Sequence, residues 1–248
     1  MKKSIALLLL VILLVIGTWF ALSSSTKLDN TSTNHQTEKN MSVGFNKSFY
    51  SHTDPNSIWV MVNKRNPLNP KSYSPTDLLV PNVPLRVPGN ETMQLRSVAA
   101  QALERMFSAA TSQGINLMLA SGYRSYAYQT NLYNGYVATQ GQSVADQQSA
   151  RPGYSEHQTG LAADVEPLSR SCEVEQCFAT TPEGKWIAAN SYKFGFIIRY
   201  PKGAASITGY EYEPWHIRYI GVSASEEMHK EGVKTLEQFF GYPPAPSY

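Results

Sequence analysis

The sequence predicts an α+β fold in which an antiparallel sheet carries a metal site and helices pack against the other side of the sheet. Apolar residues recur at helical spacing within 90–113, which predicts a long amphipathic helix. Short apolar segments at 115–120 and 196–200 predict strands. Two motifs, at 155–164 and 213–216, contribute histidines and carboxylates to one site. Their ligand chemistry and spacing determine how the rest of the chain is interpreted.

The two motifs together supply two imidazoles and one carboxylate, from His157, Asp164 and His216. Neutral nitrogen and hard oxygen donors in this number suit a catalytic zinc ion that keeps one coordination position open. Glu213 is an additional carboxylate three residues before a predicted ligand. It is therefore a candidate general base for a water molecule at the metal.

The spacing of the predicted ligands requires two changes of chain direction. Donor atoms on one zinc ion lie roughly 3–3.5 Å apart, whereas seven residues span about 23 Å in a strand and about 10 Å in a helix. His157 and Asp164 can therefore meet only if the chain reverses, and Gly160 tolerates the positive φ of a tight turn. Residues three apart, as in the second motif, point to opposite faces of a strand. Pro214 favours a bend that directs both side chains to the metal.

These motifs resemble those of a known enzyme family. Ser-x-His-x-x-Gly-x-Ala-x-Asp followed by Glu-x-x-His, with Ser-Gly-Tyr-Arg-Ser at 121–125 and Tyr128-Gln129 upstream, resembles the zinc D-alanyl-D-alanine carboxypeptidases of the VanY type. The pattern is close to that of the LD-carboxypeptidases of Gram-positive cell walls, and more distantly similar to the D-Ala-D-Ala dipeptidases and the hedgehog signalling domain. The resemblance covers roughly residues 85–240. It implies a fold of the hedgehog and DD-peptidase type, one Zn²⁺ held by the three predicted ligands, and Glu213 as the base.

Further residues near the motifs are candidates for substrate binding. Arg124 follows a predicted strand, and its planar set of donors suits a substrate carbonyl oxygen or carboxylate. Glu156, between two motif residues, is expected to be solvated. The remaining residues predicted to line the substrate site are Tyr123, Tyr128, Gln129, Ser155 and Trp215.

The resemblance implies that the substrate is the stem peptide of peptidoglycan, from which the C-terminal D-Ala is released. Two alternatives use the same chemistry: an LD-carboxypeptidase and an endopeptidase that cuts inside the stem peptide or cross-bridge. A third, of another class, is a non-catalytic zinc module that binds the cell wall. Such a module has no need of Glu213, which this chain retains. The motifs do not separate DD-, LD- and endopeptidase action, and say nothing of antibiotic resistance or oligomeric state.

The N-terminus predicts an extracytoplasmic, membrane-anchored or secreted protein of the bacterial envelope. Lys2-Lys3 precedes an apolar stretch at 5–22, so residues 1–22 form either a signal peptide or an anchor in the cytoplasmic membrane. Ala21-Leu22-Ser23 offers a cleavage site. Residues 23–47 are rich in polar residues and predict a disordered tether. In this oxidising compartment, Cys172 and Cys177 predict a local disulfide.

The zinc carboxypeptidase domain is expected to comprise 48–248. Its first part, 48–88, is a proline-rich lead-in without a core of its own, containing one short strand at 58–62. The formal net charge is +2 and no Lys/Arg run interleaves with aromatic residues. Nucleic acid is therefore not an expected partner.

Local signals predict the remaining elements in order. Asn90 is the expected N-cap of the first helix and Gly114 its stop. Thr181 and Pro182 predict the start of a helix that ends before Gly195. The other predicted helices are 127–140, a short one at 144–149, 224–231 and 234–240, and the last predicted strand is 216–220.

Overall fold

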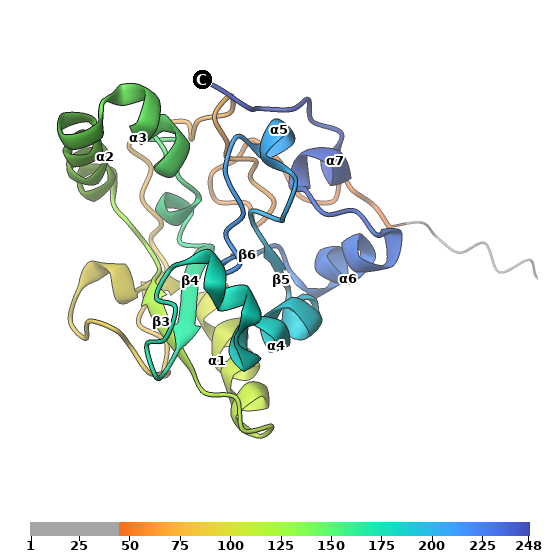
Figure 1. The fold of residues 1–248 in the computed structure, drawn as a ribbon. Coiled ribbons are helices and arrows are strands. Elements are labelled where there is room, and N and C mark those ends of the chain that lie inside the picture. The colour runs from red at the N-terminus through yellow and green to blue at the C-terminus, as the bar shows by residue number, and fades with distance from the viewer. Residues whose placement is uncertain (1–44) are drawn as a thin grey trace, which may run out of the picture. The chain divides into compact units, whose positions relative to one another are not determined.

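A four-stranded antiparallel sheet lies at the centre of the computed structural model, which describes residues 45–248. Its strands, in spatial order, are β3 (Leu117–Ser121), β4 (Ala162–Pro167), β6 (His216–Tyr219) and β5 (Phe196–Ile198). Figure 1 shows helices around this sheet, so the predicted α+β class is confirmed. The predicted signal peptide or anchor at 1–22, and the tether at 23–47 except its last three residues, lie outside the described residues.

The two faces of the sheet differ because side chains alternate along each strand. Leu119, Val165 and Ile217 join one apolar core with two helices, α1 (Ser97–Thr111) and α4 (Pro182–Asn190). Asp164 and His216 alternate with these core residues and are direct partners across β4 and β6. The strand register therefore brings two predicted ligands together on the face opposite α1.

The other helices surround this framework. α2 (Tyr126–Gln140) and α3 (Gln142–Gln148) form a hairpin at one end of the molecule in Figure 1, and α6 (Val222–Glu231) and α7 (Leu236–Phe240) pack at another. Minor elements are β1 (Leu78–Leu79), β2 (Leu95–Arg96), α5 (Ala205–Thr208) and 3₁₀ turns at Glu91–Met93, Glu156–Thr159, Gln176–Thr180 and Ser191–Phe194. Among residues 45–248, no helix has the length and apolarity needed to cross a bilayer.

The predicted helix at 90–113 begins later than expected. Asn90 caps only the short 3₁₀ turn, where its side chain accepts a hydrogen bond from the Thr92 amide. The next residues are extended, because the carbonyl of Gln94 accepts from the Tyr123 amide and the Arg96 amide donates to the Gly160 carbonyl. These bonds hold the backbone against the segment after β3 and against the first metal motif, and α1 starts only afterwards.

The predicted strand at 58–62 is absent from the described structure, although its side chains are buried as expected. Trp59 to Val62 contribute to the two apolar cores of the domain. The carbonyls of Ile58 and Val60 accept hydrogen bonds from the Arg218 guanidinium, at 3.2 and 2.9 Å, rather than from a neighbouring strand. An arginine side chain thus satisfies polar groups that a sheet would otherwise have paired.

Candidate active site

The first motif reverses direction where the sequence predicts it. Residues 156–159 form a 3₁₀ turn, and Gly160 follows with φ of 66° in the left-handed region. A Cβ there would lie 2.9 Å from the Arg96 side chain, so both the turn and its close packing require glycine. The turn places His157 before β4 and Asp164 within it.

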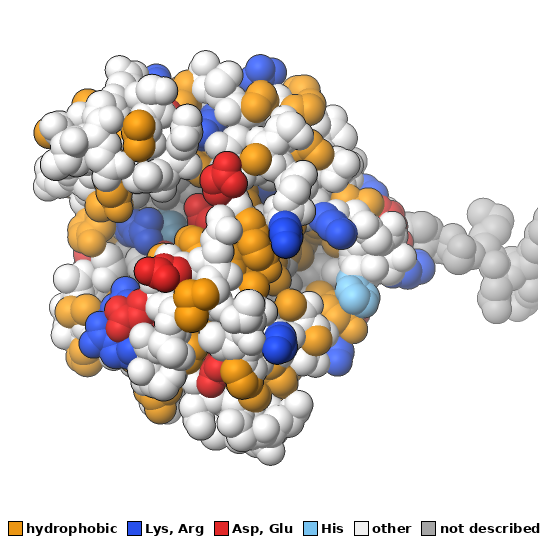
Figure 2. Space-filling model, viewed as in Figure 1, with side chains coloured by type: hydrophobic (Ala, Val, Ile, Leu, Met, Phe, Trp, Pro, Cys, Tyr) orange, Lys and Arg blue, Asp and Glu red, His pale blue; other side chains and the backbone are white. Residues whose placement is uncertain are grey.

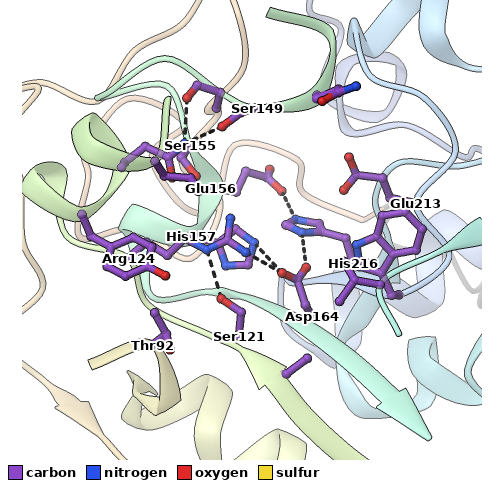
Figure 3. A pocket seen from close by; sticks show the side chains of 18 of the residues that line it. Thr92, Ser121, Arg124, Ser149, Ser155, Glu156, His157, Asp164, Glu213 and His216 are labelled. Atoms are coloured by element: carbon purple, nitrogen blue, oxygen red, sulfur yellow. Dashed lines mark hydrogen bonds and ion pairs between the residues drawn. The ribbon is translucent and has the colours of Figure 1, made fainter. Parts of the chain in front are cut away.

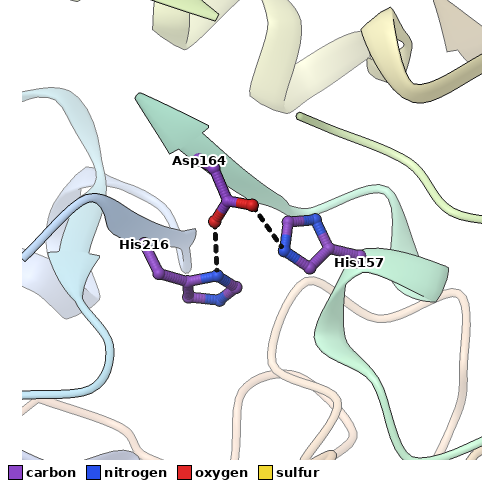
Figure 4. A group of neighbouring side chains, drawn as sticks. All are labelled: His157, Asp164 and His216. Atoms are coloured by element: carbon purple, nitrogen blue, oxygen red, sulfur yellow. Dashed lines mark hydrogen bonds and ion pairs between the residues drawn. The ribbon is translucent and has the colours of Figure 1, made fainter. Parts of the chain in front are cut away.

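The side chains of His157, Asp164 and His216 converge on one point (Figure 4). One donor atom from each lies within 4.8 Å of the other two, and all three residues are buried. Asp164 Oδ2 is 3.3 Å from His157 Nε2, and Asp164 Oδ1 is 3.0 Å from His216 Nδ1. The three donors thus lie at separations compatible with one small cation.

The hydrogen bonds of His157 show which of its ring nitrogens is available to a cation where the three side chains converge. Its Nδ1 lies 2.6 Å from the Gly122 carbonyl, which only accepts, so Nδ1 carries a hydrogen. Burial, reinforced by Arg124, lowers the pKa of His157 to about 4, so the ring is neutral at pH 7 and Nε2 presents a lone pair. That lone pair faces the Asp164 carboxylate, another acceptor. A cation between them satisfies both groups, and the nitrogen and oxygen donors suit zinc.

His216 is oriented by a carboxylate on each side of its ring. Burial alone would lower its pKa, but hydrogen bonds to Asp164 and Glu156 outweigh burial and raise the pKa of His216 to about 9. A metal ion bound at Nδ1 would replace the proton on that nitrogen.

The expectation that Glu156 is solvated is wrong. Glu156 is 2% exposed, and its Oε1 accepts hydrogen bonds from Arg199 and Arg218, each at 2.7 Å. Although burial favours its neutral form, the two guanidiniums hold the pKa of Glu156 well below its ordinary value. A sequence signal was present: Arg218 follows His216 by two residues in a strand and therefore shares its face. A buried cation there required a partner.

Glu213 approaches the same point from the second motif. The His216 amide donates to the Glu213 carbonyl at 3.2 Å, so the chain turns at Pro214 before β6 begins. Figure 3 shows the Glu213 side chain beside His216 at the pocket. Desolvation raises the pKa of Glu213 to about 7, with His216 acting in the opposite direction. A carboxylate with this pKa can accept and return a proton near neutral pH.

Arg124 lies on the opposite side of the ligands from Glu213 as viewed in Figure 3. Its Nη2 donates to Asp164 Oδ2 at 2.6 Å and its Nε to Ser121 Oγ at 3.0 Å. These two bonds fix the guanidinium, which also lines the pocket. A positive charge is therefore held in place beside the ligand centre.

A cleft of about 500 Å³ is lined by the three predicted ligands, Glu213 and Arg124. In Figure 2 a hollow below the α2–α3 hairpin exposes basic, acidic and histidine side chains. Among the residues predicted to contact substrate, those that line the cleft are Tyr128, Gln129, Ser155 and Trp215. Tyr123 is placed differently: it is 5% exposed and outside the cleft lining, and its hydroxyl lies 2.9 Å from Ser74 Oγ. This placement does not support contact between Tyr123 and a substrate in the cleft.

A disulfide-closed loop forms another part of the cleft wall. Cys172 and Cys177 are bonded to each other, and Val174 between them lines the cleft. Glu173 in the same loop pairs with Arg86, which also lines the cleft. The loop thus joins the wall through one ion pair and one apolar side chain, neither of which the motifs indicated.

The comparison with protein families identifies the family to which the chain belongs. The model of the family described as "VanY: D-alanyl-D-alanine carboxypeptidase" matches residues 92–222, a range that contains the three predicted ligands, Arg124 and Glu213. The chain belongs to this family. All the motif residues that line the cleft lie within the range matched by the VanY family model.

Two relatives are similar to this chain over more of its length than the family model matches. The chain is 44% identical to "Putative carboxypeptidase YodJ" of Bacillus subtilis (strain 168) over 75% of this chain and 68% of that protein. It is 38% identical to a D-alanyl-D-alanine carboxypeptidase of Enterococcus faecium over 58% of this chain and 43% of that protein. The second enzyme thus has much sequence that this chain does not match.

Two solved structures share the fold. The LdcB LD-carboxypeptidase is 43% identical, with a TM-score of 0.72, over 76% of this chain and 88% of that chain. A mutant of the vancomycin-resistance D,D-pentapeptidase VanY, from a VanB-type cassette and in complex with Zn(II), is 30% identical with a TM-score of 0.60, over 74% of this chain and 98% of that chain. The predicted family and fold are therefore confirmed.

Proposed function

We propose that the chain is a zinc-dependent carboxypeptidase that removes the C-terminal D-Ala from peptidoglycan stem peptides. The observation that carries this proposal is the buried convergence of His157, Asp164 and His216 at a cleft that Glu213 and Arg124 also line. The Zn(II) complex of the related VanY enzyme supports the metal. The stoichiometry proposed is one ion, because one such cluster is found within residues 45–248.

The mechanism assigns a role to each side chain. Zinc held by the three ligands would lower the pKa of a water molecule and polarise the scissile carbonyl. Glu213 accepts a proton from the attacking water and returns it to the leaving amine, in keeping with its raised pKa. Arg124, fixed by Asp164 and Ser121, stabilises the developing oxyanion or binds the substrate carboxylate. The substrate then contacts Tyr128, Gln129, Ser155 and Trp215 along the cleft.

The test measures the products from defined stem peptides. Purified protein with zinc is incubated with a pentapeptide ending in D-Ala-D-Ala and with a tetrapeptide ending in L-Lys-D-Ala, and the products are identified by mass spectrometry. Loss of one D-Ala from the pentapeptide is expected, and the Glu213→Gln variant is the control for contaminating peptidases. Cleavage inside the stem or cross-bridge would instead assign an endopeptidase. No cleavage by zinc-loaded protein would favour the non-catalytic cell-wall binding module.

A second candidate is an LD-carboxypeptidase that acts on the tetrapeptide. The observation in its favour is the similarity to the LdcB structure, which exceeds the similarity to the VanY structure in both identity and TM-score. Preferential loss of D-Ala from the tetrapeptide would select this candidate.

The carboxypeptidase proposal requires recognition of a free terminal carboxylate. Arg124 and Ser155 line the cleft and offer charged and hydroxyl donors. Amidation of the substrate terminus should therefore reduce kcat/KM strongly, because the donors would then lack their anion. Equal turnover of the free acid and the amide would contradict carboxypeptidase action.

We further propose that the domain acts outside the cytoplasm, anchored in the cytoplasmic membrane or secreted. The charged and apolar sequence of residues 1–22 supports this placement. Fractionation of cells that express the full chain, with accessibility to external protease, tests it. A purely cytoplasmic protein would contradict the proposal.

A further inference from the structure

Glu156 contacts the metal centre although it is not one of the predicted ligands. Its Oε2 lies 3.4 Å from His216 Nε2, on the ring edge opposite the nitrogen that faces Asp164 (Figure 3). Its other oxygen is held by Arg199 and Arg218. The carboxylate therefore connects a predicted zinc ligand to two buried cations.

The two arginines are themselves fixed from other parts of the chain. Arg199 makes two further bonds to Glu237, both at 2.9 Å, and Glu237 accepts another from Asn63 at 3.0 Å. The two guanidiniums and two carboxylates balance in charge, and all four residues are at most 2% exposed. A buried network of this kind resists reorganisation, because a change at one member leaves a charge unpaired. Glu156 is thus held in one orientation.

This orientation decides which nitrogen of His216 can bind a metal. An ionised carboxylate accepts hydrogen bonds but donates none, so a bond to Glu156 requires the hydrogen on Nε2. The lone pair of the neutral ring is then on Nδ1, which faces Asp164 and His157. In His157 the two nitrogens have the reverse roles: Nδ1 is bonded to the Gly122 carbonyl, and Nε2 faces Asp164. The two rings therefore present different nitrogens to the same point.

We propose that Glu156 is a positioning residue of the metal centre: it holds the hydrogen of His216 on Nε2 and so prepares Nδ1 as the ligand atom. The proposal rests on the proposed zinc site. The competing explanation is that Glu156 serves only as counter-ion to Arg199 and Arg218. Glu237 allows the two explanations to be separated, because it is equally buried and pairs with Arg199 without contacting His216.

The Glu156→Gln variant changes the donors that face His216. Arg199 and Arg218 both donate to the same oxygen, so the amide oxygen remains on their side. The amide NH₂ then faces Nε2 and opposes the Nε2–H form that ligation through Nδ1 requires. Zinc affinity should fall by about 10–100-fold, the usual effect of losing a carboxylate that orients a ligand.

The experiment compares Glu156→Gln with Glu237→Gln. Zinc affinity is measured by competition with a chromophoric chelator, at a temperature where circular dichroism shows both variants to be folded. Both variants should have a lower Tm, since each removes a buried carboxylate from the same network, but only Glu156→Gln should bind zinc more weakly. Unchanged affinity in Glu156→Gln, or equal losses in both variants, would overturn the proposal.

A spectroscopic measurement adds a readout that a purely structural role would not change. In the zinc-loaded wild type, ¹⁵N NMR should show the His216 Nε2 proton shifted downfield and slow to exchange, as expected for a bond to a carboxylate. Glu156→Gln should lose this signal and Glu237→Gln should keep it. Its absence from the wild type would also overturn the proposal.

If Glu156→Gln does not fold, the double variant Glu156→Gln/Arg218→Gln takes its place, because it restores the charge balance of the network and keeps an amide donor on the side of the Ile58 and Val60 carbonyls. It should recover thermal stability relative to the single variant while zinc affinity remains low. Failure of the proposed function is distinguishable, because wild-type protein would then bind no zinc or hydrolyse no stem peptide. Wild-type affinity in a folded Glu156 variant would reject only the positioning role.

Discussion

The two faces of the central sheet belong to the same strands but carry different side chains, apolar on one face and polar on the other. In β4 and β6, Val165 and Ile217 pack against the helices in an apolar core, while Asp164 and His216 point to the cleft. Both faces are almost completely buried. On the first face burial itself stabilises the fold. On the second face burial is unfavourable unless every polar group has a partner.

The difference explains why buried charged residues lie on the same face as the predicted ligands. Arg218 follows His216 on the same side of β6 and is fully buried. It is compensated by Glu156 and by backbone carbonyls of the lead-in. The helix-packed face positions the strands, and the opposite face holds the ligands through hydrogen bonds. A substitution in the apolar core should therefore affect mainly stability, and a substitution at a predicted ligand or at Glu213 should affect mainly chemistry.

The largest effect is expected from removing two ligands. The double variant His157→Ala/His216→Ala leaves Asp164 alone at the centre and should lose nearly all zinc and activity. The domain should still fold, because neither imidazole is part of the apolar core. Metal analysis after dialysis checks this, with wild-type protein retaining about one equivalent. Near-full zinc retention by the variant would place the metal elsewhere.

A smaller effect on activity is expected from the proposed base. Glu213→Gln keeps the shape of the side chain but cannot accept a proton, so kcat/KM should fall by about 10²–10⁴-fold. Zinc content and Tm should stay close to those of the wild type. Steady-state kinetics with the pentapeptide, together with metal analysis, measures both quantities. Turnover near the wild-type rate would remove Glu213 from the mechanism, and loss of zinc would make it a ligand.

The smallest effect on chemistry is expected from the opposite face. Ile217 is adjacent to His216 but fully buried against the helices. Ile217→Ala should reduce the free energy of unfolding by about 2–5 kcal/mol through the lost burial and the cavity it leaves. Urea denaturation measures this change, and the kcat of the folded fraction should remain near wild type. A large loss of kcat without a loss of stability would show that the two faces are not separable in this way.

The sequence by itself determined the elements that depend on local chemistry. The donor types in the two motifs, Gly160 at the reversal and Pro214 at the bend each act over a few residues, so their consequences could be predicted without a fold. The same holds for the helix that begins at Pro182 with Thr181 as its N-cap. The apolar segments at 115–120 and 196–200 likewise predicted strands, which the structure contains as β3 and β5.

Only the tertiary structure decided the contacts between segments distant in the chain. Glu156 lies 60 residues before His216 and 43 before Arg199, and nothing within its own motif indicates that β6 and the residue after β5 bring two cations to it. Residues 58–62 form no strand, because the Val60 carbonyl accepts its hydrogen bond from Arg218, 158 residues later in the chain. The start of α1 likewise depends on backbone bonds from Gln94 and Arg96 to the segment after β3 and to the first metal motif. Partners of this kind are set by strand register and packing, which local periodicity does not encode.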